Sequence, residues 1–326
     1  MKILFTSTHE TSFIREDLTL LRKSFNVQHL ITRGAFAAPK ILMGILSSDI
    51  TFTWFASVYS AIVVFFGRVC GKRSVVVVGG VDAARYPEIS YGIWISRWKA
   101  PLVRYAMMNA HRLLIVDPSL EKQVRELAGY HGENIECLPT GFDPSVWTPG
   151  RKPKEGRVLA AAACNGIPRM KVKGLPFLLE AARLMSDVPF TIIGPGDKMA
   201  AILRKEAPPN VEVFSFIPRE ELLSQYQGAR VYCQPSVFEG LPSSVCEAML
   251  CECIPVGTNV GGIPTAIGDA GFLVRYGNVG ELVGALRQAL DAPEEMGKKA
   301  RRHVEQHYNL EKREAGLKRV VQEAAG

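Results

Sequence analysis

The chain has 326 residues, of which 47% are hydrophobic and 22% charged, and its formal net charge is +7. This composition excludes a disordered or fibrous protein, and the length predicts two domains, because one hydrophobic core seldom serves more than about 250–300 residues. The positive charge is spread along the chain, so no nucleic-acid partner is expected. It fits an anionic substrate, an acidic membrane surface or simple solubility.

The seven cysteines lie mostly in apolar stretches and are expected to be reduced thiols in the core. Cys251 and Cys253 suggest a metal site, but neither a nearby His nor a second Cys pair accompanies them, so we predict none. Residues 2–6 are typical of a buried strand and not of a signal peptide. Residues 56–66 are too short to span a bilayer, which takes about 20 residues. We expect a cytoplasmic protein, with peripheral attachment to the inner face of the membrane as an alternative.

The first half of the chain alternates short β-branched runs with helical segments. Strands are expected at residues 2–6, 27–30, 50–54, 74–78, 113–116 and 135–138. A helix is expected at residues 16–24, and further helical segments separate the later strands, for example at residues 57–70 and 119–127. This alternation indicates βαβ units and therefore a mostly parallel sheet.

A segment rich in Pro, Gly and charge begins at Trp147 and predicts a linker. The alternation then restarts, with strands expected at residues 158–163, 190–193, 211–214, 231–234 and 254–256. Helices are expected at residues 175–185, 220–227, 243–250 and 279–289. Residues 296–325 have helical spacing and are predicted to form one or two surface helices whose charges face solvent.

The expected fold class is therefore α/β, with two doubly wound Rossmann-like domains facing a central cleft. Residues 1–147 form the N-terminal domain and residues 148–307 the C-terminal domain in this prediction, and residues 308–326 can pack back on the first. Doubly wound sheets bind ligands beyond the carboxyl ends of their strands, which places the expected site in the cleft.

The strongest local signal is the segment 235–249, which follows a predicted strand and then enters a helix. Backbone N–H groups at a helix start, together with the positive end of the helix dipole, form a seat for a diphosphate without a metal. The predicted donor-binding residues at this helix start are Gly240, Leu241, Pro242, Ser243 and Ser244.

Two acids flank this helix start. Glu247, one turn into the helix, can accept hydrogen bonds from both ribose hydroxyls of a nucleotide, and Glu239 in the loop would lie near the sugar end. From spacing alone, two solvated acids beside a helix start are an equally good interpretation.

Glu239 and Glu247 form an E-x7-E pattern that resembles the large retaining GT-B glycosyltransferase family, glycosyltransferase group 1, which includes sucrose synthases and phosphatidylinositol mannosyltransferases. Residues 253–265 resemble the strand and Gly-Gly-x-Pro turn that follow the motif in this family, residues 270–274 the next block, and residues 138–143 the Pro-Asn-Gly-Val-Asp segment. The resemblance covers most of residues 110–326. It implies a GT-B fold, a nucleotide-sugar donor and no metal or other cofactor.

In that family a Lys before a Gly contacts the donor phosphate, and Lys173 matches this position. The family also places an Arg upstream, for which Arg169 is the candidate, although it stands one residue closer than usual. Two cations on the departing phosphate would stabilise its charge as the glycosidic bond breaks, in the manner of a metal ion. Solvated loop cations are the alternative interpretation.

The N-terminal half departs from the family pattern. A polar loop at residues 6–13 replaces the usual glycine pair and supplies the acceptor-side candidates His9, Glu10, Ser12 and Phe13. Asp82 stands where many relatives have a His near the reacting sugar, and we predict that it contacts the sugar or the acceptor. The alternatives are that Asp82 caps a turn and that His9 is an ordinary loop residue.

The resemblance implies a retaining transfer of a hexosyl-type sugar from a nucleotide-diphosphate sugar to a hydroxyl of a lipid, a glycan or a small molecule. A nucleotide-sugar 2-epimerase and a non-catalytic partner subunit remain as alternatives. A dinucleotide-dependent oxidoreductase is disfavoured, because no G-x-G-x-x-G follows the first strand. Aromatic and basic residues at 91–104 either approach a membrane or pack against their own domain.

Overall fold

The computed structural model describes residues 1–34 and 36–325, and it divides the chain into two compact units. Unit 1 consists of Met1–Gly141 with Leu310–Gly326, and unit 2 of Phe142–Asn309. We had predicted the boundary after Trp147. The division falls earlier because the Phe142 N–H donates to the carbonyl of Tyr308, 2.7 Å away, and the Trp147 ring packs against Tyr226.

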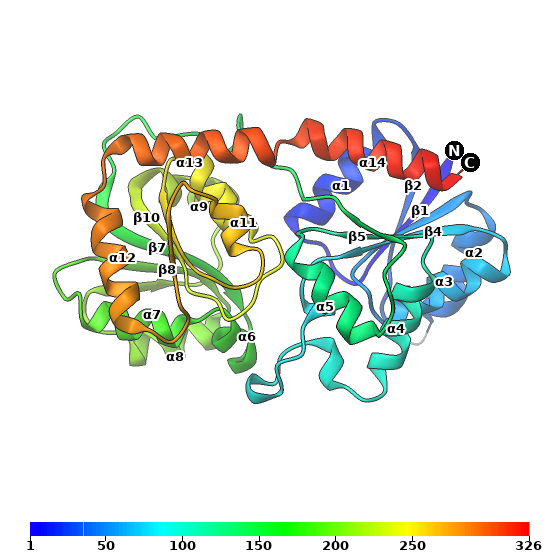
Figure 1. Ribbon diagram of the computed structural model, residues 1–326, viewed down its shortest axis with the longest axis horizontal. Coiled ribbons are helices and arrows are strands. Elements are labelled where there is room, and N and C mark those ends of the chain that lie inside the picture. Colours follow the sequence, from blue (N-terminus) through cyan, green and yellow to red (C-terminus); the bar gives the residue numbers. More distant parts are fainter. Residues whose placement is uncertain (35, 326) are drawn as a thin grey trace. The chain divides into compact units, whose positions relative to one another are not determined.

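Unit 1 contains a six-stranded parallel sheet in the order β2-β1-β3-β4-β5-β6. Its strands are β1 (Lys2–Ser7), β2 (Asn26–Ile31), β3 (Ile50–Trp54), β4 (Arg73–Val78), β5 (Arg112–Ile115) and β6 (Ile135–Cys137). Its α-helices are α1 (Ser12–Arg22), α2 (Ala37–Leu46), α3 (Val58–Val69), α4 (Lys99–Asn109), α5 (Ser119–Ala128) and α14 (Leu310–Ala325). Three 3-10 turns, Val81–Ala83, Pro87–Ile89 and Ile93–Ile95, connect β4 to α4. The sheet and its helices are drawn in Figure 1.

Unit 2 contains a second six-stranded parallel sheet, in the order β12-β11-β10-β7-β8-β9. Its strands are β7 (Glu155–Cys164), β8 (Phe190–Pro195), β9 (Val211–Phe214), β10 (Ala229–Gln234), β11 (Ile254–Thr258) and β12 (Phe272–Val274). Its helices are α6 (Ile167–Val172), α7 (Leu175–Arg183), α8 (Asp197–Glu206), α9 (Arg219–Gly228), α10 (Ser243–Leu250), α11 (Ile263–Ile267), α12 (Val279–Asp291) and α13 (Glu294–His307).

The central strands form because both of their faces are covered. Val75, Val76, Val77 and Val78 of β4 are all fully buried, as expected for a strand of a parallel sheet with helices on both sides. Local signals fix some of the helix starts. At α3, the Ser57 hydroxyl accepts the Ser60 N–H and the Ser60 hydroxyl accepts the Ser57 N–H, which is a reciprocal cap.

The C-terminal segment forms two helices, as predicted, and the second belongs to unit 1, as we had expected for residues 308–326. It is not a fully solvated surface, because one face of α14 is buried. The Arg313 guanidinium of α14 is 1% exposed and pairs with the carboxylate of Asp17 in α1, with nitrogen to oxygen distances of 2.8 and 2.6 Å. The Trp54 indole N–H donates to the same carboxylate. This ion pair fixes α14 on the sheet of unit 1.

No helix in the described part of the chain combines the length and the apolar character that crossing a membrane requires.

Candidate functional site

The loop between β10 and α10 carries most of the predicted site and is held from two sides. On one side, the Val237 N–H donates to the carbonyl of Val172, 2.8 Å away, at the end of α6. On the other, the Gly262 N–H donates to the Glu239 carbonyl, and the Thr258 hydroxyl donates to a carbonyl of the same loop. The loop therefore has one defined conformation at the carboxyl end of β10.

Two glycines permit these close contacts. Gly174 has a φ of +66°, and a Cβ there would lie 1.7 Å from the carbonyl oxygen of Pro235. Gly261 has a φ of +51°, and a Cβ there would lie 2.1 Å from the carbonyl oxygen of Glu239. Lys173-Gly174 and Gly261-Gly262 are thus the points at which neighbouring segments approach the loop between β10 and α10.

We predict that Gly174→Ala destabilises unit 2 by about 2–4 kcal/mol, because it adds a collision with a backbone carbonyl to the cost of a left-handed backbone. Gly277→Ala is the matched control: Gly277 also has a positive φ, +85°, but an added Cβ there meets nothing within 4 Å. Chemical denaturation of both variants separates steric collision from backbone strain. Equal losses of unfolding free energy would contradict this account.

The structure brings Lys173 and Glu239 together. The Lys173 ammonium lies 2.7 Å from Oε1 of Glu239, and both side chains are largely buried, with 19% and 13% exposed. The same carboxylate oxygen accepts hydrogen bonds from the Gln234 side-chain amide at 2.9 Å and the Ser236 hydroxyl at 2.8 Å. One acid and one cation predicted from separate motifs therefore form a single hydrogen-bonded group.

Gln234, which the sequence analysis did not single out, connects this group to α10. Its amide nitrogen donates to Glu239, and its amide oxygen accepts from the hydroxyls of Tyr232, at 2.9 Å, and Ser244, at 3.2 Å. Because Gln234 is the last residue of β10, its place at the carboxyl end of a strand was a signal that could have identified it. The Ser244 hydroxyl, predicted to donate to a phosphate, has Gln234 as its acceptor in this structure.

Helix α10 begins as predicted, with Pro242 as the residue that precedes its first turn. Gly240 and Leu241, which lead into it, are buried, whereas Ser243 and Ser244 are half-buried. The first N–H groups of any α-helix have no acceptor within that helix, so this end presents donors. The turn that precedes α10 is the one fixed by Gly174 and Gly261.

Glu247 lies one turn into α10 and is half-buried. Burial raises its pKa to about 7, although the charge of Arg219 and the Tyr226 hydroxyl, 3.4 Å away, both favour the ionised form. The Tyr226 ring contacts the rings of Trp147 and Tyr232. A carboxyl in this setting changes protonation close to neutral pH.

Arg169 lies on α6, is exposed, and stands one helical turn before Lys173, whose N–H donates to the Arg169 carbonyl. The positive charges of Lys173 and Arg169 both lower the pKa of the Cys164 thiol, although burial raises it overall. Both positive charges therefore lie close to Cys164, at the end of β7. The altered spacing of Arg169 does not move it to another part of unit 2.

Asp82 does not have the environment of a substrate-contacting acid. Its side chain is fully buried, and its carboxylate accepts the backbone N–H groups of Ala56, Gly79 and Gly80 at 2.8 to 3.3 Å. Burial raises its pKa to about 6, and these hydrogen bonds oppose the rise. The direct contact that we predicted is not supported, because the carboxylate ties the loop after β3 to the loop after β4, which is the alternative, turn-stabilising role.

The acceptor-side candidates are only partly in a loop. Ser12 and Phe13 lie in the first turn of α1, so the predicted start of this helix at residue 16 was too late. His9 is exposed and its ring stacks on the ring of Phe55 at 5.5 Å, while Glu10 lies 3.6 Å from the His29 ring.

Phe55 is a residue of this region that the sequence analysis missed. It directly follows β3 and has a φ of +67°, a conformation that costs a non-glycine residue energy and is often found at binding sites. The rings of Phe13 and Trp54 lie 6.1 and 5.5 Å from its ring. A Cβ added to Gly79 would lie 2.6 Å from the Phe55 ring, so the glycine provides the space for it. The sequence contained no signal for the positive φ.

The described residues include no group of three His, Cys, Asp or Glu side chains placed to hold a metal ion. Cys251 and Cys253, which we had considered as ligands, are buried thiols whose pKa values burial raises. The Cys253 thiol donates to backbone carbonyls at the end of α9 and the start of β10.

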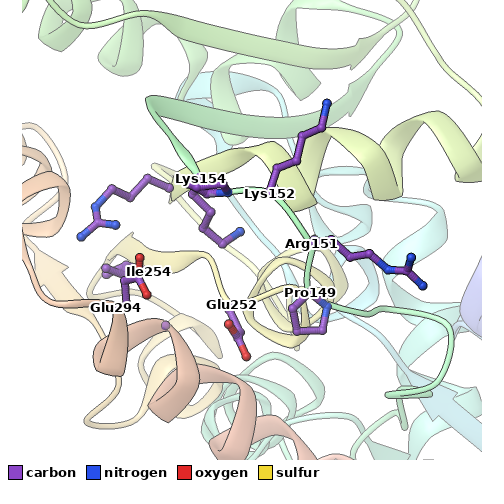
Figure 2. Close-up of a pocket in the computed structure, with 11 residues that line it drawn as sticks. Pro149, Arg151, Lys152, Lys154, Glu252, Ile254 and Glu294 are labelled. Carbon is purple, nitrogen blue, oxygen red and sulfur yellow. The ribbon is translucent and has the colours of Figure 1, made fainter.

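A cavity of about 290 Å³ lies elsewhere in unit 2, next to the linker at residues 149–154 and the first residues of β10 and β11. The cavity thus lies at the amino ends of these strands, at the opposite edge of the sheet from the loop between β10 and α10. Lys154 donates to three carbonyls around the end of α9, and Arg230 donates to carbonyls at the end of α12. Arg151, Lys152 and Glu252 also line this cavity (Figure 2), and we assign it no ligand.

Comparison with known proteins relates part of this chain to a family. Residues 161–292 match the family described as Glycosyl transferases group 1. An MMP alpha-(1->4)-mannosyltransferase of Mycolicibacterium hassiacum is 28% identical over 237 residues, which cover 65% of this chain and 55% of that protein. An alpha-maltose-1-phosphate synthase of Mycolicibacterium smegmatis is 25% identical over 58% of this chain and 54% of its own. The chain thus spans about half the length of these relatives.

Solved structures agree on the fold. Sucrose-phosphate synthase of Thermosynechococcus elongatus has a TM-score of 0.81 at 13% identity and covers 99% of this chain and 98% of its own. HepE of Anabaena, in complex with UDP and glucose, has a TM-score of 0.81 at 14% identity, with 99% of each chain covered. The segment 161–292 contains Lys173, Glu239 and Glu247. Residues 161–292 of the chain thus match the glycosyl transferases group 1, and the whole chain has the two-domain GT-B fold of the solved structures.

Proposed function

We propose that the protein transfers a hexosyl-type sugar from a nucleotide-diphosphate sugar to an acceptor hydroxyl, with retention of the anomeric configuration and without a divalent metal. The observation that carries this proposal is the contact between Lys173 and Glu239 at the carboxyl end of β10, next to the start of α10. It combines a cation, an acid and helix N–H donors within the segment that matches the family.

In the proposed mechanism the Lys173 ammonium and the first N–H groups of α10 hold the diphosphate. Their charge stabilises the phosphate as it leaves, which is the electrostatic help that a metal gives in other transferases. Glu239 holds the donor sugar, and Glu247 accepts hydrogen bonds from the ribose hydroxyls. The departing phosphate itself takes the proton of the acceptor hydroxyl, so no protein nucleophile is required. Arg169 is the proposed second cation.

The substrates are expected to be a nucleotide sugar and a lipid, glycan or small-molecule acceptor. Nucleotide-sugar binding is supported by the likeness to HepE, whose structures contain UDP, UDP with glucose, or UDP-glucose. Incubation of the protein with a panel of nucleotide sugars and acceptors, read by mass spectrometry, tests the proposal. A new glycoside formed in the presence of a chelator supports it. Conversion of donor without acceptor to an epimer, or donor binding without any product, would contradict it.

We predict a pH dependence of donor binding that originates in Glu247. Its pKa of about 7 means that the carboxyl is protonated below pH 7 and ionised above it. An ionised carboxylate accepts both ribose hydrogen bonds, so donor affinity should increase by about tenfold as the pH rises through 7 and then level off. Calorimetric titration with an intact nucleotide sugar measures this, because its diphosphate does not titrate near neutral pH. In Glu247→Gln the pH step should disappear; an unchanged step would exclude Glu247 as its origin.

A further inference from the structure

Three neighbouring helices of unit 1 share an unusual charge pattern. Helices α2, α3 and α4 carry four Lys or Arg residues, which are Lys40, Arg68, Lys99 and Arg104, and none of the three contains Asp or Glu. The absence extends to the flanking segments, since residues 89–112 contain no acid and residues 33–72 contain only Asp49. Asp49 accepts a hydrogen bond from the backbone N–H of Lys2.

The three helices form one layer. Helix α3 packs against both α2 and α4, and α2 and α3 share a cluster of buried residues that includes Leu4 of β1 (Figure 1). Their inner faces are buried on the sheet, for example through Ile41 and Ile45 of α2 and Val63 of α3. The opposite faces of these helices therefore point away from unit 1.

Large apolar side chains are exposed on these outer faces. Their exposed fractions are 71% for Met43, 66% for Leu46, 50% for Phe65, 68% for Val69 and 63% for Trp98. Residues three positions apart lie on the same side of a helix. Lys40 therefore neighbours Met43 on α2, and Arg68 neighbours Phe65 on α3, so each outer face carries a cation next to an apolar side chain. The Phe65 ring also lies 6.5 Å from the ring of Tyr105 on α4, so the outer surfaces of α3 and α4 are continuous.

We had considered two roles for residues 91–104, which were approach to a membrane and packing against their own domain, and the structure supports a different role for each of two tryptophans. The Trp94 indole N–H donates to the Asp82 carbonyl at 2.7 Å, so this ring belongs to its own domain. Trp98, at the start of α4, is exposed, and the Lys99 ammonium lies 5.4 Å from the centre of its ring. An indole beside a lysine is a typical anchor at the level of lipid headgroups.

We propose that the outer faces of α2, α3 and α4, here called the α2–α4 face, dock on an anionic lipid surface. The apolar side chains enter the boundary between headgroups and acyl chains, and the cations contact the phosphates of the lipids. Charge decides between the occupants: a second copy of this chain would bring the same cations and no acids to a symmetric contact, whereas an anionic bilayer complements them. This inference is independent of the proposed transfer reaction.

The test is sedimentation of the full chain with phosphatidylcholine vesicles that contain or lack phosphatidylglycerol. Binding is expected only with the anionic lipid and should weaken as salt is raised. A charge variant, with Lys40, Arg68 and Lys99 replaced by Gln, should bind at least about tenfold more weakly. An apolar variant, with Met43, Leu46 and Trp98 replaced by Ser, should also bind about tenfold more weakly.

The matched control places the same kinds of change on unit 2, as Leu184→Ser, Lys198→Gln and Lys205→Gln, all at exposed positions. Its vesicle binding should equal that of the unchanged protein. Thermal unfolding confirms that each variant is folded; every replaced residue is exposed except Lys99, which is half-buried. The proposal is overturned by absence of vesicle binding, by equal binding of all variants, or by a dimer in sedimentation velocity that the apolar variant dissociates.

Discussion

Replacing Lys173 with alanine is expected to lower turnover of the nucleotide sugar by about 10²–10³-fold, because it removes a preorganised cation from the departing phosphate. The effect should appear in kcat, since the charge on the phosphate grows as the glycosidic bond breaks. The release of nucleoside diphosphate at saturating donor measures it, and this readout does not depend on knowing the acceptor in advance, because slow hydrolysis suffices.

The matched control is Lys171→Ala, which removes an exposed cation from α6, the short helix that ends just before Lys173. Turnover of this variant should remain within a few-fold of the unchanged protein. Because Lys173 also pairs with Glu239, the Lys173 variant is compared at a temperature well below its unfolding midpoint. A Lys173 variant with unchanged kcat, or a Lys171 variant with an equal loss, would refute the assignment of Lys173 to the phosphate.

The second large effect concerns stability. Arg313→Ala is expected to lower the unfolding free energy of unit 1 by about 3–5 kcal/mol, because it leaves the buried carboxylate of Asp17 without its counter-charge. The guanidinium also donates to the Leu138 carbonyl at 2.6 Å, so a second buried acceptor loses its donor. Urea denaturation measures the change, and the double variant Asp17→Asn with Arg313→Met should recover much of it, since it removes both charges.

Arg319→Ala provides the comparison on the same helix. Arg319 pairs with Glu136 and Glu323, but its side chain is half exposed, and solvent-exposed pairs contribute about 0–1 kcal/mol. Its loss should therefore be small. If the Arg313 and Arg319 variants unfold at the same urea concentration, the buried pair does not fix α14 on the sheet.

Periodicity predicted the central strands of both sheets because parallel strands buried on both faces are continuous apolar runs. β10 was expected at residues 231–234 and spans Ala229–Gln234, and α10 has the predicted bounds. No bounds were predicted for helices α2 and α4. The outer face of α2 carries exposed Met43 and Leu46 beside Lys40, so α2 lacks the clear separation of polar and apolar stripes that marks an ordinary surface helix.

The candidate site was predictable as far as its chemistry is local. The spacing of Glu239 and Glu247, the helix start near residue 243 and the Lys173-Gly174 pair are all written in consecutive residues, because helix ends and tight turns depend on short segments. The contact between Lys173 and Glu239 could not be predicted in this way, because the two residues are 66 positions apart in the sequence and meet only in the folded chain.

The alternation of strands and helices, the E-x7-E motif and the family resemblance could all be recognised without a structure, because each depends on periods and spacings along the chain. Three further properties required the folded chain: Asp82 connects two loops, Arg313 is buried against Asp17, and the pKa of Glu247 is raised to about 7. Burial and charge environment are set by residues distant in sequence, and it is desolvation by those residues that gives an acid or a cation its role.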